Sequence, residues 1–291
     1  MVKRIFILQI CISGLLAVIG PVGSQESGFD HSRSSVTPND CKREVYEQNI
    51  SIETQFRLLC NLRTINSEFD QTNFSVIPSL GTVSLSIQCA EIINQESKLL
   101  NNSFQHLHQL EDLSVNHCKI GRLPRLTFSG LSRLKNLTIQ TYSDLEESAS
   151  LSIDSGTFAM LSQLTSLDLS HNKMWTMPER ELCQLPSLTY LNMSENTIKD
   201  IRDLGISGSD CSLSVGSLDL SHNDLSSISS EAFENAKHLK VLIFNNNKIS
   251  QVHDGALNGL NELKTLDLSE NNIVALPARL FFSTPEIQPK Q

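Results

Sequence analysis

Two segments of the sequence bring an aspartate, a serine and a histidine within four positions of each other. They are Asp168, Ser170 and His171, and then Asp219, Ser221 and His222. These residue types form the triad of many hydrolases, in which histidine takes a proton from the serine hydroxyl. Here the set recurs because the surrounding segment recurs, which a catalytic site has no reason to do. We therefore predict that neither set is catalytic.

A cysteine offers a second possible chemistry, that of a thiol protease. Cys183 could pair with His171 or His238, but nothing in the sequence places an oxyanion hole or a base beside it. A disulfide to Cys211 is the better account, because the irregular segment 205–214 can be pinned by such a bond. The histidines lack the short spacing of metal ligands, and no glycine-rich phosphate loop occurs. The sequence predicts no enzyme, no metal and no cofactor.

The N-terminus has the pattern of a secretory signal peptide. A basic start is followed by the apolar run 5–19 and by small residues that suit cleavage after Ser24. An uncleaved membrane anchor is the alternative, but Gln9 and Ser13 interrupt a run that is already short for a bilayer. No later segment approaches a transmembrane length. The sequence predicts the secretory pathway, with an extracellular or cell-surface location.

The charge balance bears on the class of partner. The chain carries a formal net charge of −9, and removal of residues 1–24 takes away Lys3 and Arg4 but no acidic residue. Such acidity disfavours nucleic acid as a partner and suits a basic protein.

Six cysteines remain after Cys11 is lost with the signal peptide, and an oxidising compartment favours disulfides between them. Cys41 and Cys60 bracket a short apolar segment, and we predict that they are linked in a cap over the first core layer. Closing a loop of this length is worth on the order of 3 kcal/mol. The pairing of Cys89 and Cys118 stays open, and Cys118 can be buried and free.

A repeat with a period of about 24 residues organises the second half of the chain. Each copy has the form Leu-x-x-Leu-x-Leu-x-x-Asn-x-Leu, with other apolar residues at some leucine positions. The copies start at Leu164, Leu188, Val215, Leu239 and Leu263. This is the leucine-rich-repeat template, whose period is about 20 to 29 residues. Weaker copies start at Leu110 and Leu134, and Leu85-x-Ile87 is one further degenerate strand.

The template predicts the fold. The Leu-x-Leu pair forms a short strand with both leucines in the core, and the strands stack in parallel. The asparagine sits where the chain turns away and can bind backbone groups that would otherwise be unpaired. We predict an α/β repeat solenoid, a leucine-rich-repeat horseshoe with a parallel sheet on its concave side.

The segments outside the repeats complete the expected domain order. It is a signal peptide at 1–24, a disordered leader at 25–40, an N-terminal cap region at 41–80, leucine-rich repeats at 81–282 and an irregular tail at 283–291. The tail carries no cysteine cluster, so we expect the C-terminal cap to be absent. Phe281 and Phe282 would then lie on an open core edge that favours aggregation or partner binding.

Five acceptor sequons for N-glycans occur in the chain, and some occupancy is expected in a secreted protein. The asparagines are Asn49, Asn73, Asn101, Asn136 and Asn192. Asn136 and Asn192 precede or follow a strand leucine, so both point outward from the concave face. Glycans on both would screen the middle of this face and direct a folded ligand to an edge or an end.

Two further features are candidate ligand-binding sites. The first is an insertion at residues 140–150, whose acidic character would suit a basic partner. Its candidate residues are Tyr142, Asp144, Glu146 and Glu147. The second is the pair Val241 and Ile243, which are apolar where the sister repeats are usually polar. A solvated variable loop and neutral drift are the alternatives to these two hypotheses.

Several stretches resemble insect Toll receptors of the long-ectodomain, eighteen-wheeler class. They are Leu62-Arg-Thr-Ile-Asn-Ser-Glu-Phe-Asp, Cys118-Lys-Ile, Leu191-Asn-Met-Ser-Glu-Asn and Asn272-Ile-Val-Ala-Leu-Pro. The resemblance covers about residues 41–282. It implies the N-terminal part of a receptor ectodomain that binds a dimeric cystine-knot cytokine of the Spätzle type, or another leucine-rich-repeat ectodomain, in immune or developmental signalling. The alternative is a secreted decoy or a cell-adhesion or matrix protein.

Overall fold

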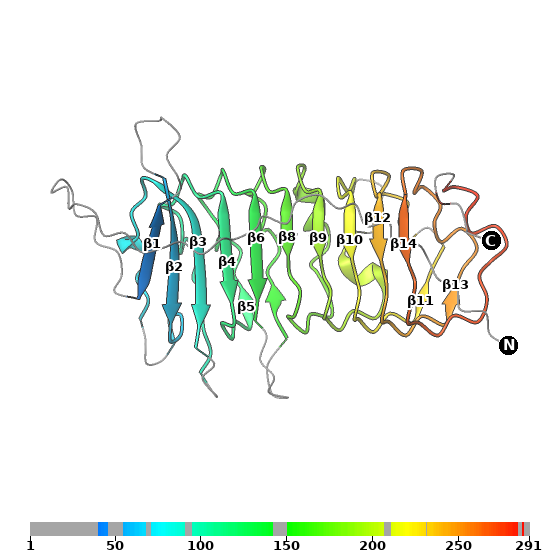
Figure 1. Cartoon of the computed structure of the whole chain (residues 1–291), viewed down its shortest axis with the longest axis horizontal. Coiled ribbons are helices and arrows are strands. Elements are labelled where there is room, and N and C mark those ends of the chain that lie inside the picture. The colour runs from blue at the N-terminus through cyan, green and yellow to red at the C-terminus, as the bar shows by residue number, and fades with distance from the viewer. Residues whose placement is uncertain are drawn as a thin grey trace, which may run out of the picture.

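The fold is a solenoid whose main sheet runs along the long axis of the molecule (Figure 1). The computed structural model describes residues 40–45, 55–67, 71–90, 95–141, 150–206, 211–230, 232–284 and 287. The predicted signal peptide and leader lie outside these residues. In spatial order, the ten strands of the sheet are β1 (Cys41–Val45), β2 (Phe56–Leu62), β3 (Thr82–Cys89), β4 (Asp112–Asn116), β6 (Asn136–Gln140), β8 (Ser166–Asp168), β9 (Tyr190–Asn192), β10 (Ser217–Asp219), β12 (Val241–Ile243) and β14 (Thr265–Asp267).

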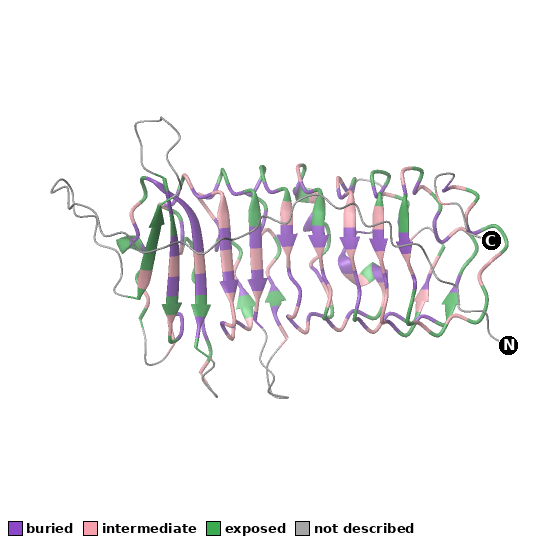
Figure 2. Cartoon of the chain, viewed as in Figure 1, coloured by how far each residue is buried: buried purple, intermediate pink, exposed green. Residues whose placement is uncertain are grey.

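The strands from β2 onward pair in parallel and in a register that the repeat fixes. The middle leucine of each strand lies beside its counterpart in the next, as in Leu191 of β9 beside Leu218 of β10. These leucines are buried, while the residues before and after them face outward (Figure 2). The alternation follows from the pleat of a strand. Only β1 runs antiparallel, at the N-terminal edge. The predicted parallel leucine-rich-repeat sheet is therefore confirmed.

The segments that return from one strand to the next differ from the predicted α/β class. They hold the two-residue strands β5 (Arg122–Leu123), β7 (Ser152–Ile153), β11 (Ser227–Ile228) and β13 (Gln251–Val252), and the 3-10 helices η1 (Phe74–Val76), η2 (Leu182–Gln184) and η3 (Ile201–Leu204). None of the described segments forms an α-helix. The repeat template admits helical and 3-10 returning segments alike, so its period does not decide between them.

A ladder of asparagines, buried except for the half-buried Asn271, joins successive repeats where the strands end. Asn196 shows the pattern: its Oδ1 accepts from the backbone N–H groups of Asn172 and Met174, at 3.2 and 2.8 Å. Its Nδ2 donates to the carbonyl oxygens of Leu169, Met193 and Ser194. The ladder contains Asn172, Asn196, Asn223, Asn247 and Asn271. The asparagine role predicted from the repeat is thus visible in the contacts.

A row of phenylalanines fills the core of the N-terminal half, away from the sheet. Phe104, Phe128 and Phe158 are fully buried and come from the returning segments of successive repeats. The rings of Phe104 and Phe128 are 6.5 Å apart between centroids, and those of Phe128 and Phe158 are 5.9 Å apart. Phe74 continues the row at 4.9 Å from Phe104. Stacked aromatic rings in this range contribute beyond their buried area.

Three disulfides connect the six cysteines of the described chain. Cys41 is bonded to Cys60 across the edge pair β1 and β2, which confirms the predicted N-terminal disulfide. Cys183 is bonded to Cys211. The third bond joins Cys89 to Cys118, so the option of a buried free Cys118 is corrected. These two cysteines meet because β3 and β4 are neighbours in register, and Cys89 is the last residue of β3 while Cys118 follows the last residue of β4 by two positions.

Loss of the Cys183–Cys211 bond should lower the free energy of unfolding by about 3 kcal/mol, because it releases a loop of 28 residues in sequence separation. Denaturant unfolding of a Cys183→Ser/Cys211→Ser variant gives the value, and mass mapping of the secreted protein without reduction should find the three pairs named above. Unchanged stability, or a free thiol at any of the six positions, would contradict the arrangement.

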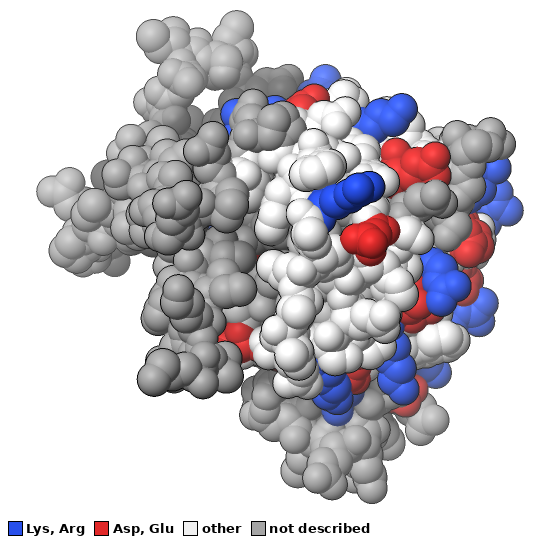
Figure 3. All heavy atoms as spheres, turned by 90° about the vertical axis from the view of Figure 1, so that its right-hand side faces the viewer, with Lys and Arg blue, Asp and Glu red and all other residues white. Residues whose placement is uncertain are grey.

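The last described layer shows a mixture of covered and open apolar residues. Leu280 is buried, Phe281 is half-buried and Phe282 is 78% exposed. Viewed toward this end, the visible surface is largely uncharged at its centre, with acidic and basic side chains around it (Figure 3). Among the described residues, no helix has the length and apolar character to cross a membrane.

Candidate ligand-binding face

The outward side chains of the parallel strands form one continuous surface, which we call the sheet face. Its first row runs along the starts of the strands and contains Ser84, Asp112, Asn136, Ser166, Tyr190, Ser217, Val241 and Thr265. Its second row lies two residues further along each strand and contains Ser86, Ser114, Thr138, Asp168, Asn192, Asp219, Ile243 and Asp267. Adjacent members of a row lie about 4.8 Å apart.

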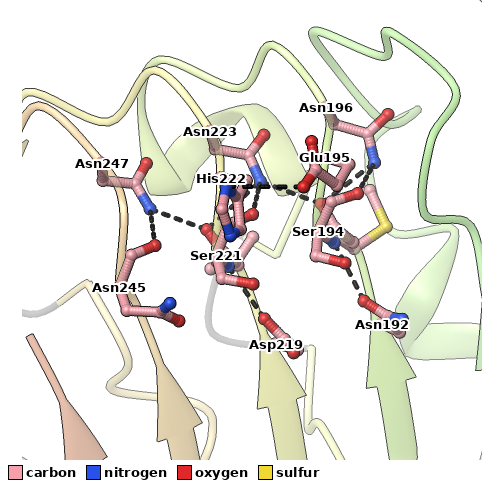
Figure 4. Close-up of polar contacts among 12 residues, drawn as sticks. Asn192, Ser194, Glu195, Asn196, Asp219, Ser221, His222, Asn223, Asn245 and Asn247 are labelled. Carbon is pink, nitrogen blue, oxygen red and sulfur yellow. Dashed lines mark hydrogen bonds and ion pairs between the residues drawn. The ribbon is translucent and has the colours of Figure 1, made fainter. Parts of the chain in front are cut away.

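The second row is held in place by short side-chain to backbone bonds at the strand ends. Oδ1 of Asp219 accepts from the backbone N–H of Ser221 at 2.8 Å, and Oδ1 of Asn192 accepts from that of Ser194 at 3.0 Å (Figure 4). Asp168 and Asp267 make the same bond. Each such bond fixes the direction of the side chain and uses one oxygen of each carboxylate.

The second aspartate, serine and histidine set lies where the chain turns at the end of β10, and its polar contacts are those that hold this turn. Asp219 binds the backbone of Ser221, whereas Nδ1 of His222 lies 3.4 Å from Oε1 of Glu195 in the preceding repeat (Figure 4). His222 has a φ of 53°, because the chain turns sharply just before the ladder asparagine. His222 thus contacts a carboxylate of the neighbouring repeat, whereas a hydrolase triad requires histidine to bond the serine hydroxyl.

The most distinctive part of the sheet face surrounds a tyrosine. We define the Tyr190 patch as Tyr190, Asp168, Asp219, Val241 and Ile243. Tyr190 is 40% exposed and lies between β8 and β10, whose Asp168 and Asp219 stand diagonally on either side. Partial burial of the ring, and then the charges of Asp168 and Asp219, raise the pKa of the Tyr190 hydroxyl above its ordinary value.

Of the residues that the sequence suggested as ligand-binding candidates, the structure describes some and not others. Val241 and Ile243 lie on the sheet face at neighbouring positions of β12, and both are half-buried. Tyr142, Asp144, Glu146 and Glu147 of the insertion lie outside the described residues. The structure thus brings Val241 and Ile243 together with Tyr190, which the sequence analysis did not single out. Tyr190 directly precedes the buried strand leucine Leu191, as Val241 precedes Leu242. The position before a strand leucine faces outward, so the same reasoning identifies Tyr190 as a residue of the sheet face.

Four of the five sequon asparagines are described, and their settings differ. Asn73 and Asn101 are exposed and lie off the sheet, and Asn73 caps η1. Asn136 is exposed on β6 and donates to Asp112. Asn192 is half-buried on β9, within the second row between Asp168 and Asp219. Asn49 lies outside the described residues. Any glycan on Asn192 would occupy the centre of the Tyr190 patch.

The described part of the chain offers no cluster of three or more histidine, cysteine or carboxylate side chains that could hold a metal ion. Near the N-terminal end, a broad open hollow lies between η1 and the following repeat, with Val76, Pro78, Gln105, His106 and His108 among its lining residues. Its openness makes it a surface groove between repeats and not an enclosed small-molecule site.

Comparisons with known proteins agree with this architecture. The sequence model for the leucine rich repeat matches residues 144–198 and 214–287. Toll-like receptor 7 of Drosophila melanogaster is 33% identical over 214 residues, which cover 70% of this chain and 15% of that receptor. Toll-like receptor 3 of Boselaphus tragocamelus is 29% identical over 275 residues, which cover 90% of this chain and 29% of that receptor. The chain therefore spans less than a third of these relatives.

Among solved structures, a leucine-rich-repeat protein of Leptospira interrogans superposes with a TM-score of 0.58. The superposition covers 79% of this chain and 52% of that protein at 22% sequence identity. At this identity the likeness supports the fold alone. Together, the comparisons show leucine-rich repeats and homology to Toll-like receptors.

Proposed function

We propose, from the homology of this leucine-rich-repeat chain to Toll-like receptors, that it forms part of the extracellular ligand-recognition region of a Toll-type receptor. The observation that carries the proposal is the sheet face, a continuous surface with a fixed register on which Tyr190 is exposed and Val241 and Ile243 are half-buried among polar residues. Concave or flat sheets built from repeats offer extended surfaces of this kind to partners.

The ligand we propose is a protein, and more finely a dimeric cystine-knot cytokine of the Spätzle type. Supporting this choice are the stretches that resemble insect Toll receptors and the identity with the fly receptor. The charge of the sheet face adds physical support, because Asp112, Asp168, Asp219 and Asp267 give it a negative field that favours a basic protein surface.

A glycan placed on the sheet face tests this proposal. Asp219→Asn creates the sequon Asn-Leu-Ser with Leu220 and Ser221, so a single substitution attaches a bulky glycan at the centre of the face. Asp219→Ser removes the same charge without creating a sequon. Binding of a purified Spätzle-type dimer to the immobilised, secreted chain is measured by surface plasmon resonance, with glycan attachment verified by mass.

We expect the glycosylated Asp219→Asn variant to bind at least 50-fold more weakly than the Asp219→Ser variant, because the glycan excludes a folded partner from the face. Equal binding by the two variants would contradict docking on the sheet face. Absence of cytokine binding by the unaltered chain, together with binding to a second leucine-rich-repeat ectodomain, would replace the receptor proposal with the cell-adhesion alternative.

The insertion at residues 140–150 stays a second proposed contact at the edge of the solenoid. Asp144, Glu146 and Glu147 give it negative charge, which would strengthen encounter with a basic ligand at low salt. Reversal of these three acids to lysine should then weaken cytokine binding to the full-length receptor. An unchanged dissociation constant at low salt would remove the insertion from the binding site.

A further inference from the structure

The Tyr190 patch combines an aromatic ring, two carboxylates and two aliphatic side chains on one side of the sheet. Tyr190 belongs to the first row, between Ser166 and Ser217, so its neighbours in that row are small. Asp168 and Asp219 belong to the second row, one strand to either side of Asn192. Their Cα atoms are about 10 Å apart at roughly 4.8 Å per strand.

The two carboxylates are available to a partner. Each uses Oδ1 to accept a backbone N–H of its own turn, at 2.9 Å for Asp168 and 2.8 Å for Asp219. Within the part of the chain that the structure describes, neither carboxylate forms an ion pair with a lysine or an arginine. The outward positions of the main-sheet strands β3, β4, β6, β8, β9, β10, β12 and β14, as the structure describes them, also contain no lysine or arginine.

We infer that the Tyr190 patch is the docking site for an arginine side chain of a protein ligand, with Asp168 and Asp219 as its charge partners. This inference rests on the proposed function, and it specifies the chemistry of the ligand segment that contacts the sheet face. Arginine fits better than lysine because its planar guanidinium can stack on the Tyr190 ring while its N–H groups donate to carboxylates on two sides. The pKa of the Tyr190 hydroxyl, raised first by burial and then by the charges of Asp168 and Asp219, agrees with this geometry.

Val241 and Ile243 extend the site toward the next repeats. Val241 follows Ser217 in the first row and Ile243 follows Asp219 in the second row, so both lie one strand beyond Asp219 and three strands from Asp168. An apolar side chain about 10 Å from the arginine along the ligand would contact them. The patch therefore fits a basic segment that also carries an aliphatic residue.

The test uses immobilised peptides of nine arginines and of nine lysines as probes, with the secreted chain as analyte at 50 and 150 mM salt. All variants carry Asn192→Ser, which removes the sequon, and the remaining glycans are trimmed, so that no sugar decides the result. Asp168→Ser/Asp219→Ser tests the acidic pair. Serine also occupies second-row positions 86 and 114, so the sheet tolerates it there.

Asp112→Ser/Asp267→Ser is the matched control, because it removes two carboxylates from the same face, each two strands away from the nearer member of the acidic pair. We expect the arginine peptide to bind at least threefold more tightly than the lysine peptide. The patch variant should lose at least tenfold in affinity for the arginine peptide, and the control less than threefold. Tyr190→Ala should lose at least fivefold, whereas Tyr190→Phe should keep its affinity because the ring remains.

Equal losses in the patch and control variants would show that only the net charge attracts the peptide, and they would overturn the inference. Unchanged binding by Tyr190→Ala would do the same. Self-association of the unaltered chain that disappears in the patch variant, seen by sedimentation, would assign the surface to a second copy and not to a ligand. If the glycan at position 219 blocks the cytokine but the peptide results are negative, the arginine assignment fails while the proposed function stands.

Discussion

Replacement of Asn196 by alanine should lower the free energy of unfolding by about 3 to 5 kcal/mol. The Asn196 amide contacts five backbone groups in two segments, 169–174 and 193–194, and a methyl group satisfies none of them. Each buried polar group left without a partner costs about 1 to 3 kcal/mol, although rearrangement recovers part of the total. Denaturant unfolding followed by circular dichroism provides the measurement.

Asn271 supplies the matched control for this prediction, since it makes the corresponding bonds from its Nδ2 to the carbonyl oxygens of Phe244, Leu268 and Ser269. Asn271 is only half-buried, so water can replace part of what is lost. Asn271→Ala should therefore cost less than half as much as Asn196→Ala. Equal costs at the two positions would mean that burial of the ladder does not determine its contribution.

The second large effect is expected at the centre of the phenylalanine row. Phe128→Ala should lower the free energy of unfolding by about 3 to 5 kcal/mol, because it removes a fully buried ring that packs between Phe104 and Phe158 and leaves a cavity. Phe128→Leu keeps most of the volume and should cost clearly less. Phe282→Ala is the control of the same chemical change at an exposed position, and it should cost less than about 0.5 kcal/mol.

A small loss in Phe128→Ala, comparable to that of Phe282→Ala, would contradict the core assigned here. Because repeat proteins can unfold in parts, hydrogen exchange at Leu137 and Leu242 in the same variant would show whether the loss extends from the sheet near Phe128 to distant repeats. We expect faster exchange at Leu137 than at Leu242, since each repeat contacts mainly its neighbours.

Much of the fold could be predicted because a short pattern repeats. The spacing of leucines and asparagines specifies the strands, their parallel order and the ladder, and the structure shows Leu218 and Asn223 in those roles. The lack of described α-helix was not predicted, because the template admits helical and 3-10 returning segments alike. The period alone does not distinguish them.

The candidate site was less predictable because it depends on register between strands. Val241 and Ile243 were identified because they are apolar where the sister repeats are usually polar, whereas the Tyr190 patch exists only when β8, β9, β10 and β12 lie side by side. The Cys89–Cys118 bond was missed for the same reason: its partners are 29 residues apart in sequence and meet through strand pairing. A comparison of the outward residues of adjacent repeats would have found Tyr190 beside the acidic positions, whereas both cysteines are buried and meet only through the pairing of β3 with β4.

Oxidative footprinting of Tyr190 is the measurement that tests the central claim, binding of a protein ligand on the sheet face, most directly. Hydroxyl radicals modify exposed aromatic rings, and Tyr190 is 40% exposed while Trp175, outside the sheet, is 62% exposed. Upon saturation with a Spätzle-type dimer, we predict that the oxidation rate of Tyr190 falls at least fivefold and that of Trp175 changes less than twofold. An unchanged rate at Tyr190 in the saturated complex would contradict the assignment of the sheet face as the ligand-binding surface.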